Sequence, residues 1–413
     1  MRSSRGIKLT SKTLGYVVTF AIAFTMVAPT ANSQDRTSHR GIPAHRTNVD
    51  PVRAPGRSAP KSLPRAAQAK AVSYRVVSLG VLPGKNNTVV AEDPSVINNL
   101  GHVAGFSNVF TGEVEDYYVT AQAFLWKNGK LQALPLLQGW PGAFATGVND
   151  LDQVIGEANN FNSDGSRRRI ALRWDGGKVV NLGALDSNSD SAALGINLWG
   201  TAVGFSSNID TGQTTPVAWY GGTIHALPLV PGETDGVAFG INDWGVIAGQ
   251  QSDDDANLLP CLWYWSGNGY TTVSLGNLGG DFGAASDVND LGQAVGWTLY
   301  AGDLHGPAFV WKGHGLQALP TLPGDTDGYA NAINEFGQIV GFSLLFDDDG
   351  NLLSQRVVIW QNGTVTDLQT LVPANTPTFT DIGNVNLQGQ IAIEAGSFDD
   401  GSLAGYVLIP EGH

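Results

Sequence analysis

Seven copies of one short motif recur along this chain, and their spacing constrains the fold more than any other feature. In each copy a β-branched residue precedes an Asn, and a Gly or Asp follows three positions later. Self-similarity at a period near 48 residues is typical of repeat architectures, in which each unit packs on its neighbours. The seven asparagines are Asn98, Asn149, Asn197, Asn242, Asn289, Asn334 and Asn386.

Each repeat contains four short strand-like runs. A run such as LQALPLL (131–137) comes first, a second ends at the Asn, and a third such as HVAGFS (102–107) follows the turn. A fourth run ends in an aromatic residue, usually Trp, in every copy but the last, where it reads YVLIP (406–410). Apolar residues at alternate positions indicate strands with one buried face. Asn at the first and Gly at the fourth position favour a tight turn between antiparallel strands, so we assign the Asn to turn geometry. The alternative is a ring of Asn ligands around an axis.

Two glycine patterns support this assignment. Asp152 replaces the turn Gly in one copy, and Asp tolerates a left-handed backbone. A second Gly lies inside the third run in six copies, where it indicates a bulge or a close approach by a neighbouring sheet. Ile393 takes its place in the last copy. These second glycines are Gly105, Gly156, Gly204, Gly249, Gly296 and Gly341.

Four strands per unit, seven units and no helical period predict an all-β chain: a seven-bladed β-propeller built from seven ~48-residue repeats over residues 73–413. The recurrent Trp residues would fill the space between blades. We expect Trp140, Trp199 and Trp244, which lie in or beside turns, to be more exposed. If the ring closes, residues 75–82 pair with residues 406–410. A parallel β-solenoid is the alternative.

The N-terminal region differs in composition. Residues 1–33 have a basic start, an apolar run from Leu14 to Val27 and small residues before Gln34, which predicts a cleaved signal peptide and a secreted protein. An uncleaved anchor is the alternative. Residues 34–72 are rich in Pro and Arg and predict a disordered basic linker. The single Cys261 excludes an intramolecular disulfide.

Charge separates the two parts. Residues 1–72 hold 12 of the 23 Lys and Arg and 2 of the 37 Asp and Glu, which leaves residues 73–413 with a net charge of −24. So acidic a domain should repel nucleic acid and anionic membranes. We expect no nucleic-acid partner, no membrane span after signal cleavage, and a monomer. The linker would be a spacer, or it would contact an anionic envelope polymer or fold over the acidic domain.

The repeat, with its IN-D-x-G core, a following AFLW or AFVW and an LP-G or LGG link, resembles the extracellular HAF repeat family of bacterial secreted proteins. The resemblance covers about residues 75 to 410. The triplet that gives the family its name appears here without its His, as Gln122-Ala123-Phe124 and Pro307-Ala308-Phe309. The resemblance implies a secreted repeat protein with a β-propeller fold, and it implies no activity.

The sequence carries no motif of a known catalytic site. Acidic loops near residues 113–116, 253–255, 347–351 and 399–401 have the Asp-rich composition of partial calcium loops, but Asp and Gly are also what hairpin turns require. We therefore name no catalytic, cofactor-binding or metal-binding residue and expect no cofactor. The sequence favours a secreted, non-enzymatic binding or scaffolding module for a surface glycan or protein. The alternative is an extracellular hydrolase or lyase that attacks polysaccharide through loop carboxylates.

Overall fold

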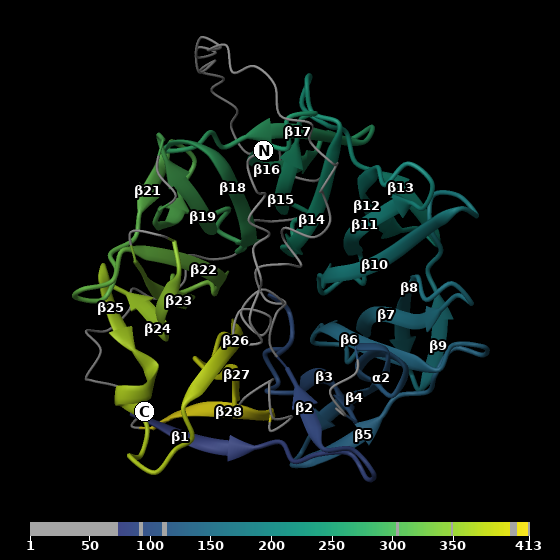
Figure 1. The fold of residues 1–413 in the computed structure, drawn as a ribbon, viewed down its shortest axis with the longest axis horizontal. Helices are drawn as coiled ribbons and strands as arrows, with labels where there is room; N and C mark the ends of the chain where they lie inside the picture. Colours follow the sequence, from purple (N-terminus) through teal and green to yellow (C-terminus); the bar gives the residue numbers. More distant parts are fainter. Residues whose placement is uncertain are drawn as a thin grey trace, which may run out of the picture.

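The computed structural model describes residues 73–90, 94–109, 114–302, 305–347, 350–396 and 403–411, and these residues are almost entirely β-strand. Seven antiparallel sheets of four strands stand around one axis (Figure 1), so the protein is a seven-bladed β-propeller. The predicted fold class is confirmed, and the solenoid alternative is wrong. The predicted signal peptide and linker, residues 1–33 and 34–72, lie outside the described residues.

The first six blades each use four consecutive strands, ordered from the axis to the rim. Blades 1 to 3 comprise β2 (Asn87–Val89), β3 (Val103–Asn108), β4 (Gln122–Lys127), β5 (Lys130–Ala133); β6 (Gly142–Val148), β7 (Val154–Phe161), β8 (Arg167–Asp175), β9 (Lys178–Asn181); and β10 (Ser189–Ile196), β11 (Ala202–Asn208), β12 (Thr214–Tyr220), β13 (Thr223–Ala226). Blades 4 to 6 comprise β14 (Asp235–Ile241), β15 (Ile247–Ser252), β16 (Leu258–Trp265), β17 (Tyr270–Ser274); β18 (Gly279–Val288), β19 (Ala294–Tyr300), β20 (Ala308–Trp311), β21 (Leu316–Ala318); and β22 (Asp327–Ile333), β23 (Ile339–Phe346), β24 (Leu352–Gln361), β25 (Thr364–Asp367).

The seventh blade joins the two ends of the described chain. Its strands β26 (Phe379–Val385), β27 (Ile391–Ala395) and β28 (Ala404–Glu411) are followed at the rim by β1 (Ser73–Ser78). The register pairs Tyr74 with Pro410 and Ser78 with Tyr406, so the predicted closure is confirmed. The paired strand begins at Ser73 and ends at Ser78, whereas we predicted residues 75–82. Two short helices, α2 (Val114–Val119) and η1 (Leu368–Leu371), lie outside the blades.

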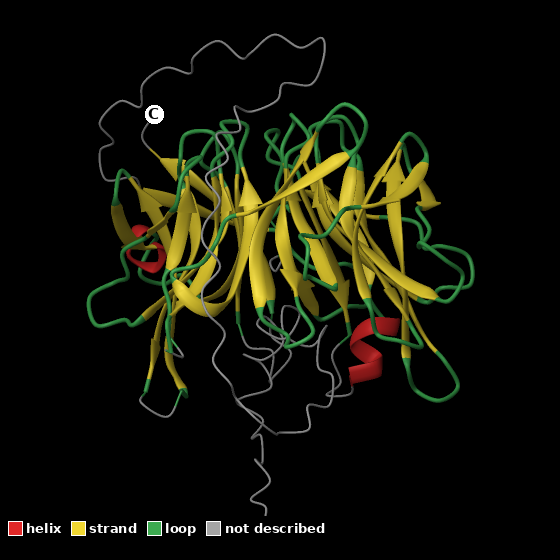
Figure 2. Cartoon of the chain, turned by 90° about the horizontal axis from the view of Figure 1, so that it is seen from above, coloured by secondary structure: helices red, strands yellow, loops and turns green. Residues whose placement is uncertain are grey.

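Strand direction gives the disc two distinct faces (Figure 2). In every blade the innermost strand runs toward the turn that begins at the motif Asn, so all seven turns lie on one side, which we call the turn face. The other side is the opposite face, and α2 lies there, because it follows the end of β3. Antiparallel pairing places the start of β1, Ser73, on the turn face at the rim.

In blades 2 to 6 the second glycine of the repeat lies opposite a β-bulge in the inner strand of its own blade. Opposite Gly156, the register of β6 shifts between Ala145 and Gly147, and a Cβ on Gly156 would lie 1.9 Å from the carbonyl oxygen of Phe144. The close approach therefore comes from the paired inner strand. Our expectation of a neighbouring sheet was wrong on this point. In blade 7, where Ile393 replaces the glycine, the register also shifts directly after the residue opposite it, between Ile382 and Val385, and a second shift lies between Phe379 and Asp381.

The Trp residues at the strand ends fill the space between blades, as predicted. Trp174 packs against side chains of the preceding blade, and its indole N–H donates to the carbonyl oxygen of Pro135 at 2.8 Å. The predicted strand 131–137 ends at Ala133, because the remaining residues cross to the next blade and Pro135 has no N–H for a ladder. Trp263 and Trp360 repeat this bond with Pro228 and Pro320.

Candidate binding face

The seven motif asparagines form a closed ring around the axis. Each side-chain N–H₂ donates to the main-chain carbonyl oxygen of the next Asn, at 2.8–3.1 Å, and Asn386 closes the circle on Asn98 across 288 residues of sequence. Each Asn Oδ1 also accepts from the amides two and four residues ahead, as Leu100 and His102 show for Asn98. The polar atoms are thus bonded to the protein. The assignment of the Asn residues to turns is confirmed. The ring of Asn side chains, which we considered as a ring of ligands, forms hydrogen bonds between neighbouring blades.

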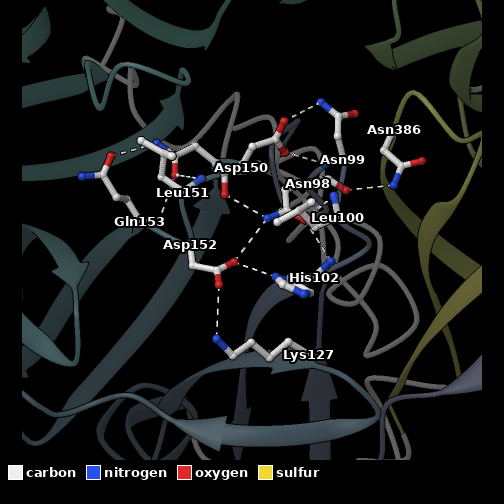
Figure 3. A network of polar contacts seen from close by, with 11 residues as sticks. Asn98, Asn99, Leu100, His102, Lys127, Asp150, Leu151, Asp152, Gln153 and Asn386 are labelled. Carbon is white, nitrogen blue, oxygen red and sulfur yellow. Dashed lines mark hydrogen bonds and ion pairs between the residues drawn. The ribbon is translucent and has the colours of Figure 1, made fainter.

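A layer of carboxylates borders this ring at the mouth of the axial channel, a hollow of about 200 Å³. In five of the seven blades the residue after the Asn accepts from an amide of the previous blade; the other two blades have Leu198 and Leu387 there. Asp150 accepts from the amide of Asn99 at 2.7 Å (Figure 3), and Glu335 accepts from the amide of Asp290 at 2.9 and 3.0 Å. We call this group the acidic mouth. It consists of Asp150, Asp243, Asp290 and Glu335.

Burial and mutual repulsion shift two of these carboxyl groups. The pKa of Asp290 is raised to about 6, chiefly by burial and also by the charge of Asp243, while the hydrogen bond from the amide of Asp243 acts in the other direction. The pKa of Glu335 is raised to about 7, chiefly by burial. The hydrogen bond from the amide of Asp290 lowers this pKa, and the charges of Asp290, Asp287 and Asp243 raise it. The mouth is therefore a site at which a positive charge would be favoured.

A second ring of large apolar side chains surrounds the acidic mouth. The third position of the turn is apolar in six of the seven blades, and only blade 7 has a polar residue there, Gln388. We call these side chains the apolar ring. Trp244 is half-buried, and the exposed fractions of the other five are 60% for Leu100, 64% for Leu151, 57% for Trp199, 56% for Leu291 and 44% for Phe336.

Turn geometry does not require an apolar residue at this position, since the Asn and Gly fix the turn. Single exposed apolar side chains scattered over a surface are ordinary, whereas several gathered on one face are typical of interaction sites. We expected exposure at Trp140, Trp199 and Trp244 from their places near turns; Trp199 is exposed, whereas Trp140 and Trp244 are half-buried. The leucines and Phe336 were missed, although the third turn position reads L, L, W, W, L, F, Q along the chain.

One seam on the turn face departs from the others. Asp152 replaces the turn Gly with a φ of 58°, and its carboxylate pairs with His102 at 2.6 Å and Lys127 at 3.2 Å in the preceding blade (Figure 3). Partial burial raises the pKa of Asp152, but the hydrogen bonds from His102 and Lys127 outweigh it and hold the pKa below its usual value. In the next seam Gln153 faces Gly200, where a Cβ would lie 2.7 Å from the Gln oxygen.

The opposite face is held by contacts that differ between seams. Asp190 accepts from Arg168 at 2.7 Å, whereas Asp327 accepts from the amide of Gly306 at 2.7 Å and pairs with His305 at 2.8 Å. Blades 7 and 1 use Glu394 instead, which accepts from the amide of Val90. These acids therefore join neighbouring blades.

The predicted acidic loops act as turns where they are described. Asp253 accepts from the amides of Asp255 and Asn257, and Asp347 accepts from the amide and side chain of Asn351. Residues 399–401 and Glu113 lie outside the described residues. In the described part of the chain no group of three or more His, Cys, Asp or Glu is placed to hold a metal ion.

Two further findings concern the rest of the molecule. A hollow of about 680 Å³ lies at the rim of blade 7, between β1 and residues 370–377, with Tyr74 and Leu371 among its lining residues. We call it the rim hollow. Among the helices of the described residues, none is long and apolar enough to cross a membrane.

Comparison with known proteins gives no relative from which function could be taken. No family model matches the chain, and no curated protein matches it either. The HAF repeat assignment therefore stays a resemblance.

TolB from Acinetobacter baumannii is a similar solved structure, with 13% sequence identity and a TM-score of 0.41; the match covers 74% of this chain and 79% of TolB. The β-propeller domain of the trilobed protease from Pyrococcus furiosus is also similar, with 9% identity and a TM-score of 0.43; that match covers 80% of this chain and 96% of the domain. A gluconolactonase from Xanthomonas campestris has 12% identity and a TM-score of 0.37, and the match covers 82% of this chain and 91% of the gluconolactonase. These scores carry no argument about function. The pairing of the strands establishes the propeller by itself.

Proposed function

We propose that this chain is a secreted, non-enzymatic β-propeller that binds a surface glycan or protein through its turn face. One observation carries the proposal: five exposed apolar side chains stand at the same turn position around a single axis. Full burial of a side chain of this size is worth about 1.5–3 kcal/mol, so a partner covering several of them would gain substantial affinity. Aromatic members such as Trp199 and Phe336 also suit stacking against a sugar ring.

The acidic groups support a binding role over catalysis. Asp150 and Asp290 accept main-chain amides of the preceding blade, and Asp190 and Asp327 hold seams on the opposite face. Each of these carboxylates therefore forms a hydrogen bond that joins two neighbouring blades. The charge of the domain and its apolar ring together favour a partner with apolar and basic groups.

One observation favours the alternative, an extracellular hydrolase or lyase that acts on polysaccharide. Glu335 has a pKa raised to about 7 beside the lower pKa of Asp290, about 6. Neighbouring carboxyl groups with separated pKa values are the usual pattern of an acid–base pair. Glu335 and Asp290 are the residues that this alternative would use.

A single series of variants tests both functions. Binding of the chain beginning at Gln34 is measured against envelope glycans and cell-surface proteins for the wild type, for the combined variant Trp199→Ser/Leu291→Ser/Phe336→Ser, and for Leu353→Ser. Leu353 is 62% exposed and lies on β24, outside the apolar ring, so it is the matched control.

Saturable binding that is lost in the combined variant and kept in Leu353→Ser supports the turn face as the binding site. Binding that survives in the combined variant contradicts it. Turnover of a polysaccharide by the wild type, abolished in Glu335→Gln, would replace the proposal with the enzymatic alternative.

A further inference from the structure

The apolar ring and the acidic mouth together present a defined chemistry to a partner. Four carboxylates stand at the centre, and exposed Leu, Trp and Phe side chains stand around them. A polypeptide that fits this face needs positive charge for the centre and compact apolar groups for the ring. Proline is such a group, because Pro-rich segments are already extended and pack on aromatic side chains at little entropic cost.

The chain itself contains a segment of this composition just before its first strand. Residues 51–65 read PVRAPGRSAPKSLPR, with a basic residue at every fourth position: Arg53, Arg57, Lys61 and Arg65. Four prolines are interspersed at positions 51, 55, 60 and 64, and the segment contains no acidic residue. In an extended proline-type conformation, at ~3.1 Å per residue, its basic groups recur about every 12 Å and it spans about 45 Å.

The segment enters the propeller on the side that carries this face. Ser73, the first residue of β1, lies at the turn-face end of the rim strand of blade 7. Three strand spacings of ~4.8 Å separate a rim strand from the inner strand of its blade, about 14 Å in all. Seven residues separate Arg65 from Ser73, and the eight steps from Arg65 to Ser73 extend to about 26 Å at ~3.3 Å each, which is longer than the distance to be crossed.

The one polar interruption of the apolar ring is in this same blade. Gln388 occupies the third turn position of blade 7, where the other blades have Leu, Trp or Phe. A chain that crosses from β1 toward the axis therefore meets no large apolar side chain at that turn. The neighbouring ring members, Phe336 in blade 6 and Leu100 in blade 1, would flank its path.

We propose that residues 51–65 dock across the turn face, with their prolines against the apolar ring and their basic side chains over the acidic mouth. The segment is then the first occupant of the face, and an external partner has to displace it. A second copy of the chain is a poorer occupant, because two acidic mouths would meet on the same axis and repel each other. The inference rests on the proposed function only in sharing its binding face.

Limited trypsin digestion tests the docking directly on the chain beginning at Gln34. All seven sheets are formed by residues 73–411, so removal of residues 1–33 leaves every strand in place. The rate of cleavage after Arg53, Arg57, Lys61 and Arg65 is divided by the rate of cleavage after Arg36 and Arg40. We expect this ratio to be at least about tenfold lower in the chain than in a synthetic peptide of residues 34–72. A tenfold protection corresponds to a docked fraction of about nine-tenths.

Two variants locate the contact. The combined variant Trp199→Ser/Leu291→Ser/Phe336→Ser should lower the protection to the value of the free peptide, while Leu353→Ser should leave it unchanged. Thermal melts establish that both variants are folded. Replacement of the four basic residues by Gln should also remove the protection, which is then measured with a protease that does not need Lys or Arg. In the wild type, 1 M salt should remove part of the protection.

Three results would overturn the inference. The first is a wild-type cleavage pattern equal to that of the free peptide. The second is protection that persists in the combined variant and is lost in Leu371→Ser, which would place the segment in the rim hollow. The third is protection that depends on protein concentration, which would indicate pairing between copies. External binding that is strong in a chain without protection would contradict this inference and leave the proposed function intact.

Discussion

On the turn face the same side chain makes the same bonds in all seven blades, whereas on the opposite face the bonds between blades change from seam to seam. The Asn ring repeats one donor and one acceptor around the axis. The opposite face uses Arg168 with Asp190 in one seam and His305 with Asp327 in another. The repeated bonds close the ring without distinguishing one blade from the next. The varied bonds depend on the identity of each neighbour, so each is specific to one pair of adjacent blades.

The largest expected effect comes from breaking the Asn ring. Asn242→Ala removes the acceptor for the amides of Trp244 and Val246 and the donor to the carbonyl oxygen of Asn289. Loss of three largely buried hydrogen bonds should cost about 2–4 kcal/mol. Chemical denaturation measures this, and Asn149→Ala should give the same loss within about 1 kcal/mol. Clearly unequal losses would contradict the equivalence of the seams on this face.

A smaller and less uniform effect is expected on the opposite face. Asp327→Ala leaves the amide of Gly306 and the ring of His305 without their acceptor and should cost about 2 kcal/mol. Asp281 lies near the start of the inner strand of blade 5 but is exposed, so Asp281→Ala should cost less than about 0.5 kcal/mol. The unfolding midpoints of the two variants in urea, each compared with that of the wild type, measure these losses. Equal losses at Asp327 and Asp281 would show that seams on this face are not individually specified.

These two aspartates show where sequence reasoning ends. The turn signals and the strand-ending Trp residues predicted the propeller, its blade count and the closure by β1, because turn chemistry and periodicity are local properties. Whether an acid at the start of an inner strand meets a basic group depends on a residue about 20 positions earlier, in the preceding blade. For the same reason the sequence indicated the Asn turns but not the bonds that run from each turn to the next blade.

The turn face offers a second case. The apolar third position was visible in the sequence as a column of Leu, Trp and Phe, yet a column of apolar residues in strands and turns usually indicates core. Only the direction of each turn away from its blade shows that Leu151 and Leu291 point outward. The acidic mouth was also missed, because its residues lie 45 or more positions apart in the sequence and meet only when the ring closes.

A pH titration distinguishes the acidic mouth from exposed acids. The folded pKa of Glu335, about 7, lies above its ordinary value of 4.5, so its contribution to stability is complete below about pH 4.5 and is lost as the pH rises through 7. Asp290 and Asp287, with pKa values raised to about 6 and about 7 by burial, change in the same direction. Stability should therefore rise as the pH falls from 8 to 5.

The variant Glu335→Gln isolates one part of this effect. Gln keeps an acceptor for the amide of Asp290 but carries no charge, so at pH 8 the variant should be more stable than the wild type by about 1–2 kcal/mol, after allowance for solvent screening. At pH 5 the two should be nearly equal. Asp254→Asn, at an exposed loop position, is the control and should shift little. A gain from Glu335→Gln that is the same at both pH values would contradict the raised pKa.

The smallest effect concerns the one seam where the turn face is not uniform. His102 and Asp152 replace the Gln and Gly that face each other as Gln153 and Gly200 in the next seam. Asp152 holds a left-handed backbone, which favours Gly, but gains the pairing with His102 and Lys127. Because these terms oppose each other, Asp152→Gly alone should change stability by less than about 1 kcal/mol.

The double variant His102→Gln/Asp152→Gly makes this seam like the next one. A double-mutant cycle at pH 7 should give a coupling energy of about 0.5–1 kcal/mol between His102 and Asp152, falling in 1 M salt. His102→Gln/Asp150→Asn is the contrasting pair, since Asp150 bonds Asn99 and not His102, and its coupling should be close to zero. Coupling of the same size in both pairs would mean that the substitutions act through the fold of the turn. Coupling confined to His102 and Asp152 would mean that even the uniform face contains one seam with a specified neighbour, which would fix the register of blades 1 and 2.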